Sequence, residues 1–231
     1  PPVKLFWRDT HLRIDGAGVY YLQYLFLADW NLCCNEKIVP SEVYFSKKKV
    51  TQNQYVQIAA SGPDSLQPSV LFSILQAIYL AKEEILITTP YFIPGDSIMN
   101  AICVAALSGL KVQLLVPGKC DSRIVNAASK SNYNELLKAG VEIYFYRKGF
   151  VHAKTIVTDG NLAIVGTANM DNRSFDLNFE VNAIIYDTGI AKKMRQVFFD
   201  DLKDAEQINK EKWLARSWFT QLPEKFARLF S

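Results

Sequence analysis

Apolar residues recur along the chain in two patterns of spacing, which predict alternating strands and helices. Short runs rich in Ile, Val and Leu, bounded by turn residues, have the length and composition of buried strands. Longer segments with apolar residues every three or four positions predict amphipathic helices. The expected strands are 55–60, 85–89, 112–116, 141–146, 154–157, 162–165 and 179–186, and the expected helices are 66–82, 97–108, 123–139 and about 190–202.

This alternation predicts an α/β fold, a mixed β-sheet flanked by helices on both faces. Asp159-Gly160 separates two of the expected strands and predicts a tight turn between antiparallel partners. The tail from Trp213 to Phe230 carries apolar residues at helical spacing with Lys and Arg between them. Its apolar face either packs on the domain or lies at a membrane interface.

An internal similarity links the two ends of the chain. The stretch 9–16 leads into a helical apolar pattern, and the stretch 180–187 leads into another of similar length. Any strand followed by a helix can look like this, but a duplicated fold also explains it. Under the second interpretation, residues 1–50 are the remnant of a first repeat, a strand and a helix, with a linker. Residues 51–231 are then a second, catalytic repeat with a C-terminal helical tail.

Composition narrows the range of functions. The 231 residues are 49% apolar and 21% charged, as in an ordinary folded globule. A net charge of +3 argues against a dedicated nucleic-acid binder but allows contact with phosphates or an anionic membrane surface. The four cysteines lack metal-ligand spacing, so we expect reduced thiols in a cytosolic setting. The chain begins Pro-Pro and has neither a signal peptide nor a run of about 18 apolar residues. We therefore expect a piece of a longer protein, and any membrane anchor could lie outside this piece.

One segment, VHAKTIVTDGNLAIVGTAN at residues 151–169, concentrates groups suited to phosphate chemistry. His152 and Lys154 are two residues apart, so their side chains share one face of an extended chain. An imidazole can attack phosphorus or shuttle a proton, while ammonium, hydroxyl and amide groups bind phosphate oxygens. The sequence therefore predicts a phosphodiester site in which His152 and Lys154 act and Lys154, Thr167 and Asn169 bind the phosphate.

The full pattern, H-x-K-x4-D-x6-G-T-x-N, resembles the signature motif of the phospholipase D superfamily, with threonine where many members have serine. Similarity to bacterial cardiolipin synthases extends over the chain, through the stretches 7–11, 61–64, 89–94 and 166–182. Asp159 matches the acid of the motif and is included among the candidate catalytic residues. Its place at a turn favours a capping role over that of a nucleophile.

The resemblance implies a two-copy enzyme. In that family two H-x-K motifs meet at a pseudo-twofold axis: one histidine forms a phosphohistidine, the other protonates the leaving alcohol, and no metal or other cofactor takes part. In cardiolipin synthases two phosphatidylglycerol molecules give cardiolipin and glycerol at the bacterial cell membrane, with the catalytic domain on the cytoplasmic side or membrane-associated. The chain would then be a C-terminal half-site, itself soluble. Its partners would be anionic lipid, a membrane surface, and a missing N-terminal repeat or a homodimer partner, with no nucleic acid.

Two acids and a second histidine complete the candidate set. The resemblance implies that Glu180 hydrogen-bonds and orients a catalytic histidine, and its apolar surroundings make an unpaired charge there costly. By the internal similarity, Asp9 has the same role in the first copy. His11 is followed by Leu-Arg and lacks the lysine of the motif, so we expect a structural role near the domain junction.

Two other functions stay open at the level of sequence. The chain could be a phospholipase D-type phosphodiesterase or nuclease that works as a dimer, although the weak net charge and the lack of a basic stripe count against it. It could also be a non-catalytic fragment that binds phosphate without turnover.

Overall fold

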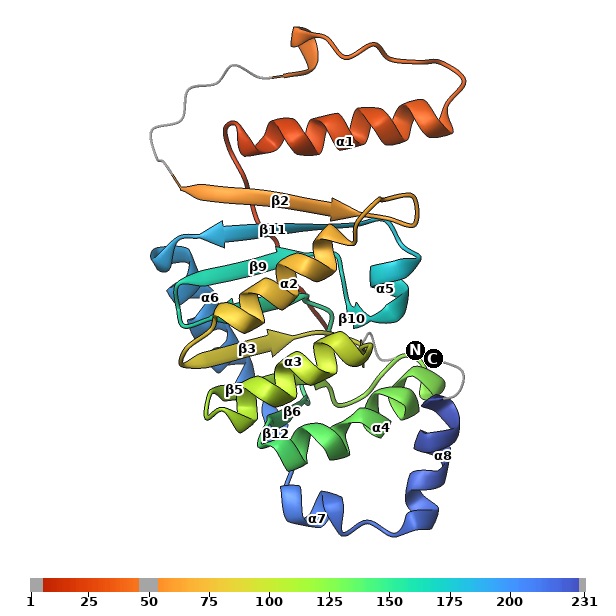
Figure 1. Cartoon of the computed structure of the whole chain (residues 1–231), viewed down its shortest axis with the longest axis vertical. Coiled ribbons are helices and arrows are strands. Elements are labelled where there is room, and N and C mark those ends of the chain that lie inside the picture. Colours follow the sequence, from red (N-terminus) through yellow and green to blue (C-terminus); the bar gives the residue numbers. More distant parts are fainter. Residues whose placement is uncertain (1–5, 46–53, 229–231) are drawn as a thin grey trace.

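Eight strands of the described chain form one mixed sheet between two layers of helices (Figure 1). The structure is a computed structural model that describes residues 6–45 and 54–228. The strands are β1 Trp7–Arg8, β2 Tyr55–Ser61, β3 Glu84–Thr88, β4 Phe92–Ile93, β5 Lys111–Pro117, β6 Glu142–Tyr146, β7 Phe150–Val151, β8 Thr155–Thr158, β9 Leu162–Gly166, β10 Met170–Asp171, β11 Glu180–Tyr186 and β12 Ala205–Gln207. The helices are α1 Gly18–Cys33, α2 Ser69–Leu80, α3 Asp96–Leu107, α4 Arg123–Ala139, α5 Asn172–Asp176, α6 Thr188–Leu202, α7 Lys210–Leu214 and α8 Trp218–Arg228, with a 3₁₀ turn at Glu42–Tyr44.

The order of strands in the large sheet is β12-β6-β5-β3-β8-β9-β11-β2. Strands β3, β5 and β6 run parallel, whereas the other neighbours in the sheet pair antiparallel. This confirms the mixed sheet, and each of the seven expected strands has a counterpart in it. The two- and three-residue strands β1, β4, β7, β10 and β12 were not predicted, because so short a segment carries no periodicity.

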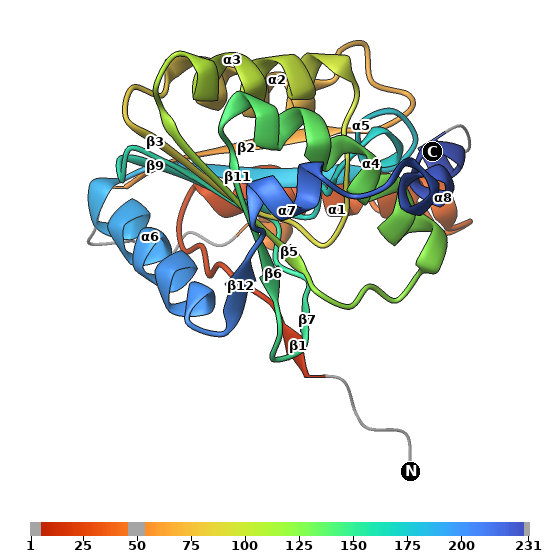
Figure 2. The ribbon, with the colours of Figure 1, turned by 90° about the horizontal axis from the view of Figure 1, so that it is seen from below.

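Side chains on the central strands alternate between two apolar cores. Ile85 and Ile87 of β3 pack in a large cluster with α2, α3 and α4, whereas Leu86 between them packs in a smaller cluster with Phe198 of α6. Both faces of the sheet are therefore buried, as the uninterrupted apolar runs predict. Viewed from below, α2, α3 and α4 cover one face and α6 the other, which confirms the expected three-layer arrangement (Figure 2).

The turn between β8 and β9 is the tight hairpin expected from Asp159-Gly160. Both residues have positive φ, 53° and 60°, the backbone geometry of a type I′ turn. The Asp159 carboxylate accepts hydrogen bonds of 2.9 Å from the backbone N–H groups of Lys82, Glu83 and Glu84, which lead into β3. Asp159 thus ties the hairpin to its neighbour.

That position bears on the prediction that Asp159 is a catalytic residue. His152 precedes β8 and Asp159 follows it, so the two lie at opposite ends of the strand. Four strand residues span about 13 Å. The contacts of Asp159 in this structure are structural, and its place among the catalytic residues stays a prediction.

The N-terminal part of the chain meets the rest in two places. Strand β1 pairs in parallel with β7, next to His152. Helix α1 lies beyond β2, at the outer end of the sheet (Figure 1). Leu27 is the buried residue of α1, while Tyr21, Tyr24 and Phe26 are 46%, 55% and 55% exposed. The proposed domain boundary at residue 50 falls outside the described residues.

Candidate active site

Chain segments far apart in sequence meet at one edge of the sheet. Because β8 and β9 run antiparallel, the residues that precede β8 and those that follow β9 lie together, and the backbone N–H of Gly166 donates to the carbonyl of Lys154. Glu180 opens the adjacent strand β11, where it pairs with Ser61 at the end of β2. Thr88 ends β3 at the same edge, opposite Thr155. The fold therefore brings both parts of the H-x-K…G-T-x-N motif together.

His152 is held by the N-terminal segment of the chain. Its backbone N–H donates to the carbonyl of Arg8 at 2.7 Å, and its Nδ1 lies 3.2 Å from Oδ2 of Asp9. Arg8 is itself fixed by a 2.8 Å ion pair with Asp201. The ring packs edge-on against Trp7, with centroids 4.9 Å apart. A histidine next to a fixed carboxylate has a defined ring orientation.

These contacts also fix the tautomer of His152. A carboxylate only accepts hydrogen bonds, so Nδ1 carries the proton that points to Asp9. Burial acts to raise the pKa of Asp9, but hydrogen bonds from His152 and from the backbone of Thr10 outweigh it and hold that pKa below its usual range. Asp9 is therefore ionised at neutral pH. The other ring nitrogen, Nε2, then carries the lone pair, which accepts a hydrogen bond from Lys154.

Lys154 is the cation beside that lone pair. Its Nζ lies 2.9 Å from Nε2 of His152 and donates to the carbonyl of the same residue at 2.7 Å. Burial lowers the pKa of Lys154 to about 8, although the carboxylates of Asp9, Glu180 and Asp171 act in the opposite direction. An ammonium has three N–H donors, and the third is available to an anionic ligand.

Thr167 and Glu180 are bound to each other. The Thr167 hydroxyl donates to the Glu180 carboxylate and accepts from the backbone N–H of Val181 at 3.0 Å. Asn178 donates to the other carboxylate oxygen at 3.1 Å. The single hydroxyl proton of Thr167 is therefore directed at Glu180, and its role in phosphate binding stays a prediction. Neither of these hydrogen bonds to Glu180 comes from a histidine, and its orienting role stays a prediction.

The presence of glycine at position 166 of the motif has a steric reason. A Cβ atom on Gly166 would lie 1.8 Å from Oδ1 of Asn182 and 2.6 Å from the backbone carbonyl of Val181. The backbone carbonyl belongs to the paired strand β11 and cannot move aside. Gly166 therefore allows β9 to approach β11 closely at this point.

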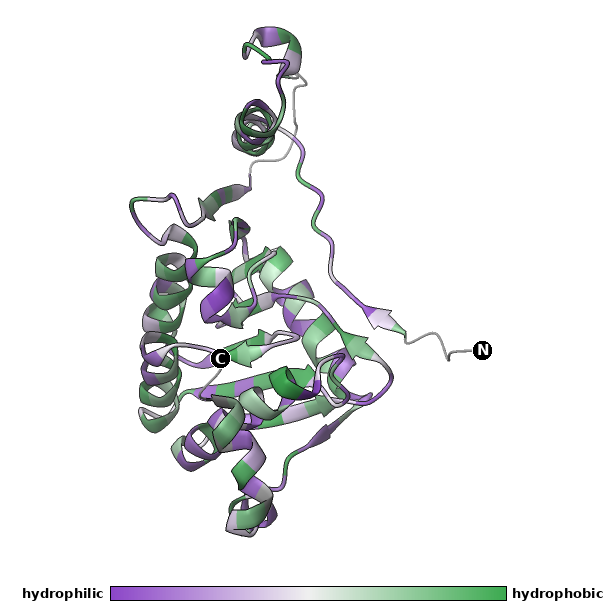
Figure 3. Ribbon diagram, turned by 90° about the vertical axis from the view of Figure 1, so that its right-hand side faces the viewer, coloured by the Kyte–Doolittle hydropathy of each residue, from purple (hydrophilic) through white to green (hydrophobic). Residues whose placement is uncertain are grey.

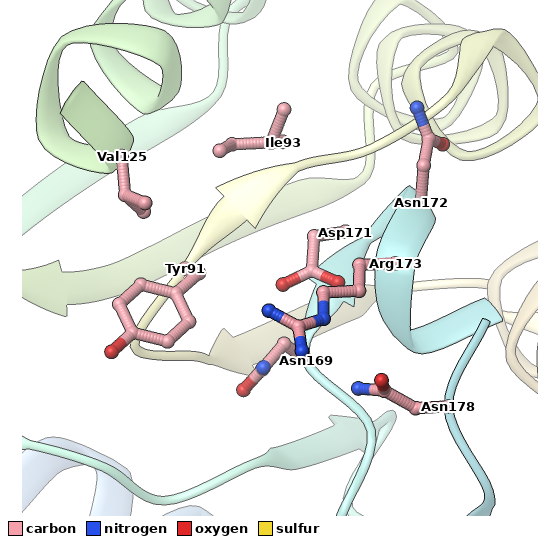
Figure 4. A pocket seen from close by; sticks show the side chains of 8 residues that line it. All are labelled: Tyr91, Ile93, Val125, Asn169, Asp171, Asn172, Arg173 and Asn178. Atoms are coloured by element: carbon pink, nitrogen blue, oxygen red, sulfur yellow. The ribbon is translucent and has the colours of Figure 1, made fainter. Parts of the chain in front are cut away.

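Next to the motif lies a pocket of about 430 Å³ (Figure 4). Its lining combines amide, carboxylate and guanidinium groups with an apolar wall and comprises Tyr91, Ile93, Val125, Asn169, Asp171, Asn172, Arg173 and Asn178. Oδ1 of Asn169 is buried and has no hydrogen-bond partner within the described ranges. Buried polar atoms are nearly always paired. The pocket thus offers a cation, amide donors and an acceptor that a ligand hydroxyl could satisfy.

The structure adds residues that sequence reasoning did not assign to this site. Asp9, assigned to the other copy by the internal similarity, contacts His152 of this chain. Asp171, Arg173 and Asn178 line the pocket, and the dense run of polar residues directly after the motif was the available signal. His11 is exposed and forms no part of this pocket. In the part of the chain that the structure describes, no three His, Cys, Asp or Glu side chains gather as metal ligands would.

Sequence comparison places this site in a known family. Residues 74–202 match the family model described as cardiolipin synthase, PLD-like domain. A cardiolipin synthase 2 of Bacillus anthracis is 45% identical over 228 residues, which is 98% of this chain and 44% of the relative. A cardiolipin synthase of Staphylococcus aureus (strain Mu50) is 44% identical over 227 residues, 98% of this chain and 46% of the relative. The chain thus spans about half the length of the curated relatives it matches.

Solved structures share the fold. A phospholipase D family member, Nuc from Salmonella typhimurium, superposes with a TM-score of 0.59 at 21% identity, over 68% of this chain and 99% of that one. A phosphatidylserine synthase of Haemophilus influenzae superposes with a TM-score of 0.60 at 16% identity, over 79% of this chain and 46% of that one. At these identities the likeness concerns the fold alone. No described helix has both the length and the apolar character needed to cross a bilayer.

Proposed function

The chain belongs to the phospholipase D-like family of cardiolipin synthases, and from that premise we propose that it carries one half of the site that joins two phosphatidylglycerol molecules into cardiolipin. The observation that carries the proposal is the arrangement around His152. Its Nδ1 faces Asp9, and its Nε2 lies beside Lys154 at the edge of the motif. This is a nucleophile with a fixed tautomer and a cation next to it, as phosphoryl transfer through a covalent intermediate needs.

In the first step, Nε2 of His152 attacks the phosphorus of one phosphatidylglycerol. The N–P bond forms as the P–O bond to the terminal glycerol breaks, and glycerol leaves with a proton from a second histidine. Asp9 stabilises the positive charge that develops on the ring, as the acid of a catalytic triad does. Lys154 binds a non-bridging oxygen on which negative charge accumulates.

In the second step, a hydroxyl of another phosphatidylglycerol attacks the phosphohistidine. The second histidine, now neutral, takes the hydroxyl proton as general base, the N–P bond breaks, and cardiolipin is released. The chain's other histidine, His11, is exposed and carries no lysine two residues on. The second histidine therefore comes from a second motif, in an upstream repeat or in another copy of this chain.

The pocket beside the motif suits the head group. Arg173 adds a second cation for the phosphate, and Asn169 has an amide donor for a phosphate oxygen and a buried acceptor for a glycerol hydroxyl. Tyr91, Ile93 and Val125 form an apolar wall along which the glycerol backbone can lie. The polar end of the pocket is the end nearest the motif, since Asn169 belongs to both.

The positions of two acids fit an arrangement in which each repeat supplies the acid that serves the histidine of the other repeat. Asp9, which by the internal similarity belongs to the first repeat, serves the histidine of the second. By the same symmetry Glu180, held by Thr167 and Asn178, faces the histidine of the first repeat. We propose the division at residue 50 on this basis, with 1–50 as the end of a first repeat and 51–231 as the second.

The proposal is tested in a bacterial strain that makes no cardiolipin, by expressing the protein at the full length of its relatives and measuring cardiolipin by mass spectrometry. Cardiolipin should appear with the wild type and be lost with His152→Ala. Synthesis that survives His152→Ala would contradict the assignment. Nicking of plasmid DNA by the purified protein without cardiolipin formation would favour a nuclease instead.

A further inference from the structure

Helix α8 presents its apolar side to solvent. Trp218, Phe219, Leu222 and Phe226 are 57%, 75%, 38% and 64% exposed. At 100° per residue they fall within an arc of about 100° on one side of the helix. A surface helix of a globular protein normally turns such a stripe toward the core.

The inward side of α8 is polar or small instead. Gln221 accepts a hydrogen bond from Asn134 of α4 at 3.1 Å, and Glu224, 8% exposed, forms an ion pair with Arg216 at 2.7 Å. Ala227 is buried on the same side. On this side Gln221 joins α8 to α4 and Glu224 joins it to the preceding segment, whereas Trp218 and Phe219 stay mainly exposed.

Helix α8 lies on the side of the molecule that carries the pocket. Helix α8 packs along α4, which lines the pocket through Val125 in its first turn, and both views place α8 and α5 on one side (Figures 1 and 2). Figure 3 faces this side, with the C-terminal end in view. Further apolar side chains are exposed on α4 and on the α5–β11 segment, with Ile124, Leu177 and Phe179 at 66%, 67% and 61%.

Charge on these elements is mixed. Lys119, Arg123 and Arg173 are exposed near the pocket, together with the carboxylates of Asp121 and Asp176. With Asp171 of the pocket lining counted, these charges balance, so electrostatic attraction to an anionic surface is weak here. Apolar contact has to supply most of any binding energy on this side.

We propose that α8 is an interfacial helix that seats the pocket side of the protein on an anionic lipid bilayer. Trp and Phe favour the layer between head groups and acyl chains, and a helix with an apolar stripe lies in that layer. The inference rests on the proposed function, because phosphatidylglycerol resides in a bilayer and its head group must reach the pocket from there. When the outward stripe of α8 is inserted in the membrane, the lipid head groups lie at the height of that pocket.

The test is flotation of the purified chain with vesicles of phosphatidylglycerol and phosphatidylcholine. Trp218→Ser combined with Phe219→Ser should weaken binding roughly tenfold or more, since two interfacial aromatic anchors are lost. The matched control is Leu80→Ser combined with Leu107→Ser, at the ends of α2 and α3, where the side chains are 65% and 72% exposed. The control should bind as the wild type does, and both variants should keep the wild-type Tm.

Two outcomes overturn the inference. One is α8-variant binding equal to that of the wild type. The other is a change of oligomeric state in the α8 variant without lipid, by light scattering, because the stripe would then be a protein interface. His152→Ala should bind vesicles normally while losing synthesis. Failure of the α8 variant to lose binding therefore refutes the membrane face, and synthesis by His152→Ala refutes the proposed function.

Discussion

The tautomer of His152 is the feature on which the chemistry depends at the scale of single residues. Asp9 holds the proton on Nδ1, so Asp9→Ala leaves both tautomers accessible and removes the charge that stabilises the cationic ring. Cardiolipin formation should fall by about 10²–10⁴-fold in kcat with little change in KM. Asp15→Ala, which removes a nearby exposed carboxylate paired with Arg13, is the control and should stay near wild type. Equal losses in the two variants would mean that Asp9 acts only through folding.

Lys154 makes phosphate binding sensitive to alkaline pH. Its pKa is lowered to about 8, so the ammonium is present below that pH and is lost as pH rises through it. KM for phosphatidylglycerol should therefore rise above about pH 8. Lys154→Arg keeps its charge at these pH values and should flatten the rise, even if kcat drops. Lys148→Gln removes an exposed lysine paired with Asp204 and should leave the profile unchanged. A KM that is constant up to pH 10 in the wild type would exclude Lys154 as the ligand.

The sequence was enough to predict the residues of the motif, but not the contacts between residues far apart in the chain. The spacing of His152 and Lys154 placed both on one face because strand geometry is local. Asp9 lies 143 residues from His152, and the parallel pairing of β1 with β7 that joins them leaves no periodic signal. The hydrogen bond from the Thr167 hydroxyl to Glu180 is likewise a tertiary contact that no local pattern predicts. Pocket residues such as Arg173 were visible only as polar residues.

At the scale of elements, Asp159 links the β8–β9 hairpin to β3. Asp159→Ala removes three hydrogen bonds from backbone N–H groups to one carboxylate and should lower the free energy of unfolding by about 1–3 kcal/mol. Asp159→Asn should lose less, because asparagine tolerates the positive φ of this turn and can still accept. Urea denaturation measures both. Activity per folded molecule should stay near wild type in both variants. A large loss of kcat would instead indicate that Asp159 has a catalytic role.

The long elements were predictable for a physical reason that the short ones lack. Strands β3, β5 and β9 are runs of Ile, Leu and Val buried on both faces, so composition alone marks them. For helix α8 the pattern of apolar residues predicts less. Its periodicity predicts the helix and an apolar side, but which side meets the domain is decided by the contacts of Gln221 and Glu224 with their partners.

At the scale of the whole molecule, the proposed half-site requires a surface that meets another unit. The relatives are about twice as long, and α1 exposes Tyr21, Tyr24 and Phe26 at the outer end of the sheet. If α1 belongs to the end of a first repeat, its apolar side chains pack on that repeat in a longer protein. A helix kept in place by another unit need not bury its apolar face against its own chain.

The proposed pairing of two histidines also predicts the kinetic order of the reaction. Under this proposal, turnover by the isolated chain requires two copies of His152, so the initial rate should rise with the square of chain concentration below the dissociation constant of the pair. Adding excess His152→Ala chain should suppress the activity of a fixed amount of wild type, because mixed pairs hold a single histidine. Under the same proposal a protein of the relatives' full length carries both motifs, so its rate should stay proportional to its concentration and should not change when the His152→Ala chain is added. First-order turnover by the isolated chain, unaffected by His152→Ala, would show that one motif suffices and that the second histidine is not needed.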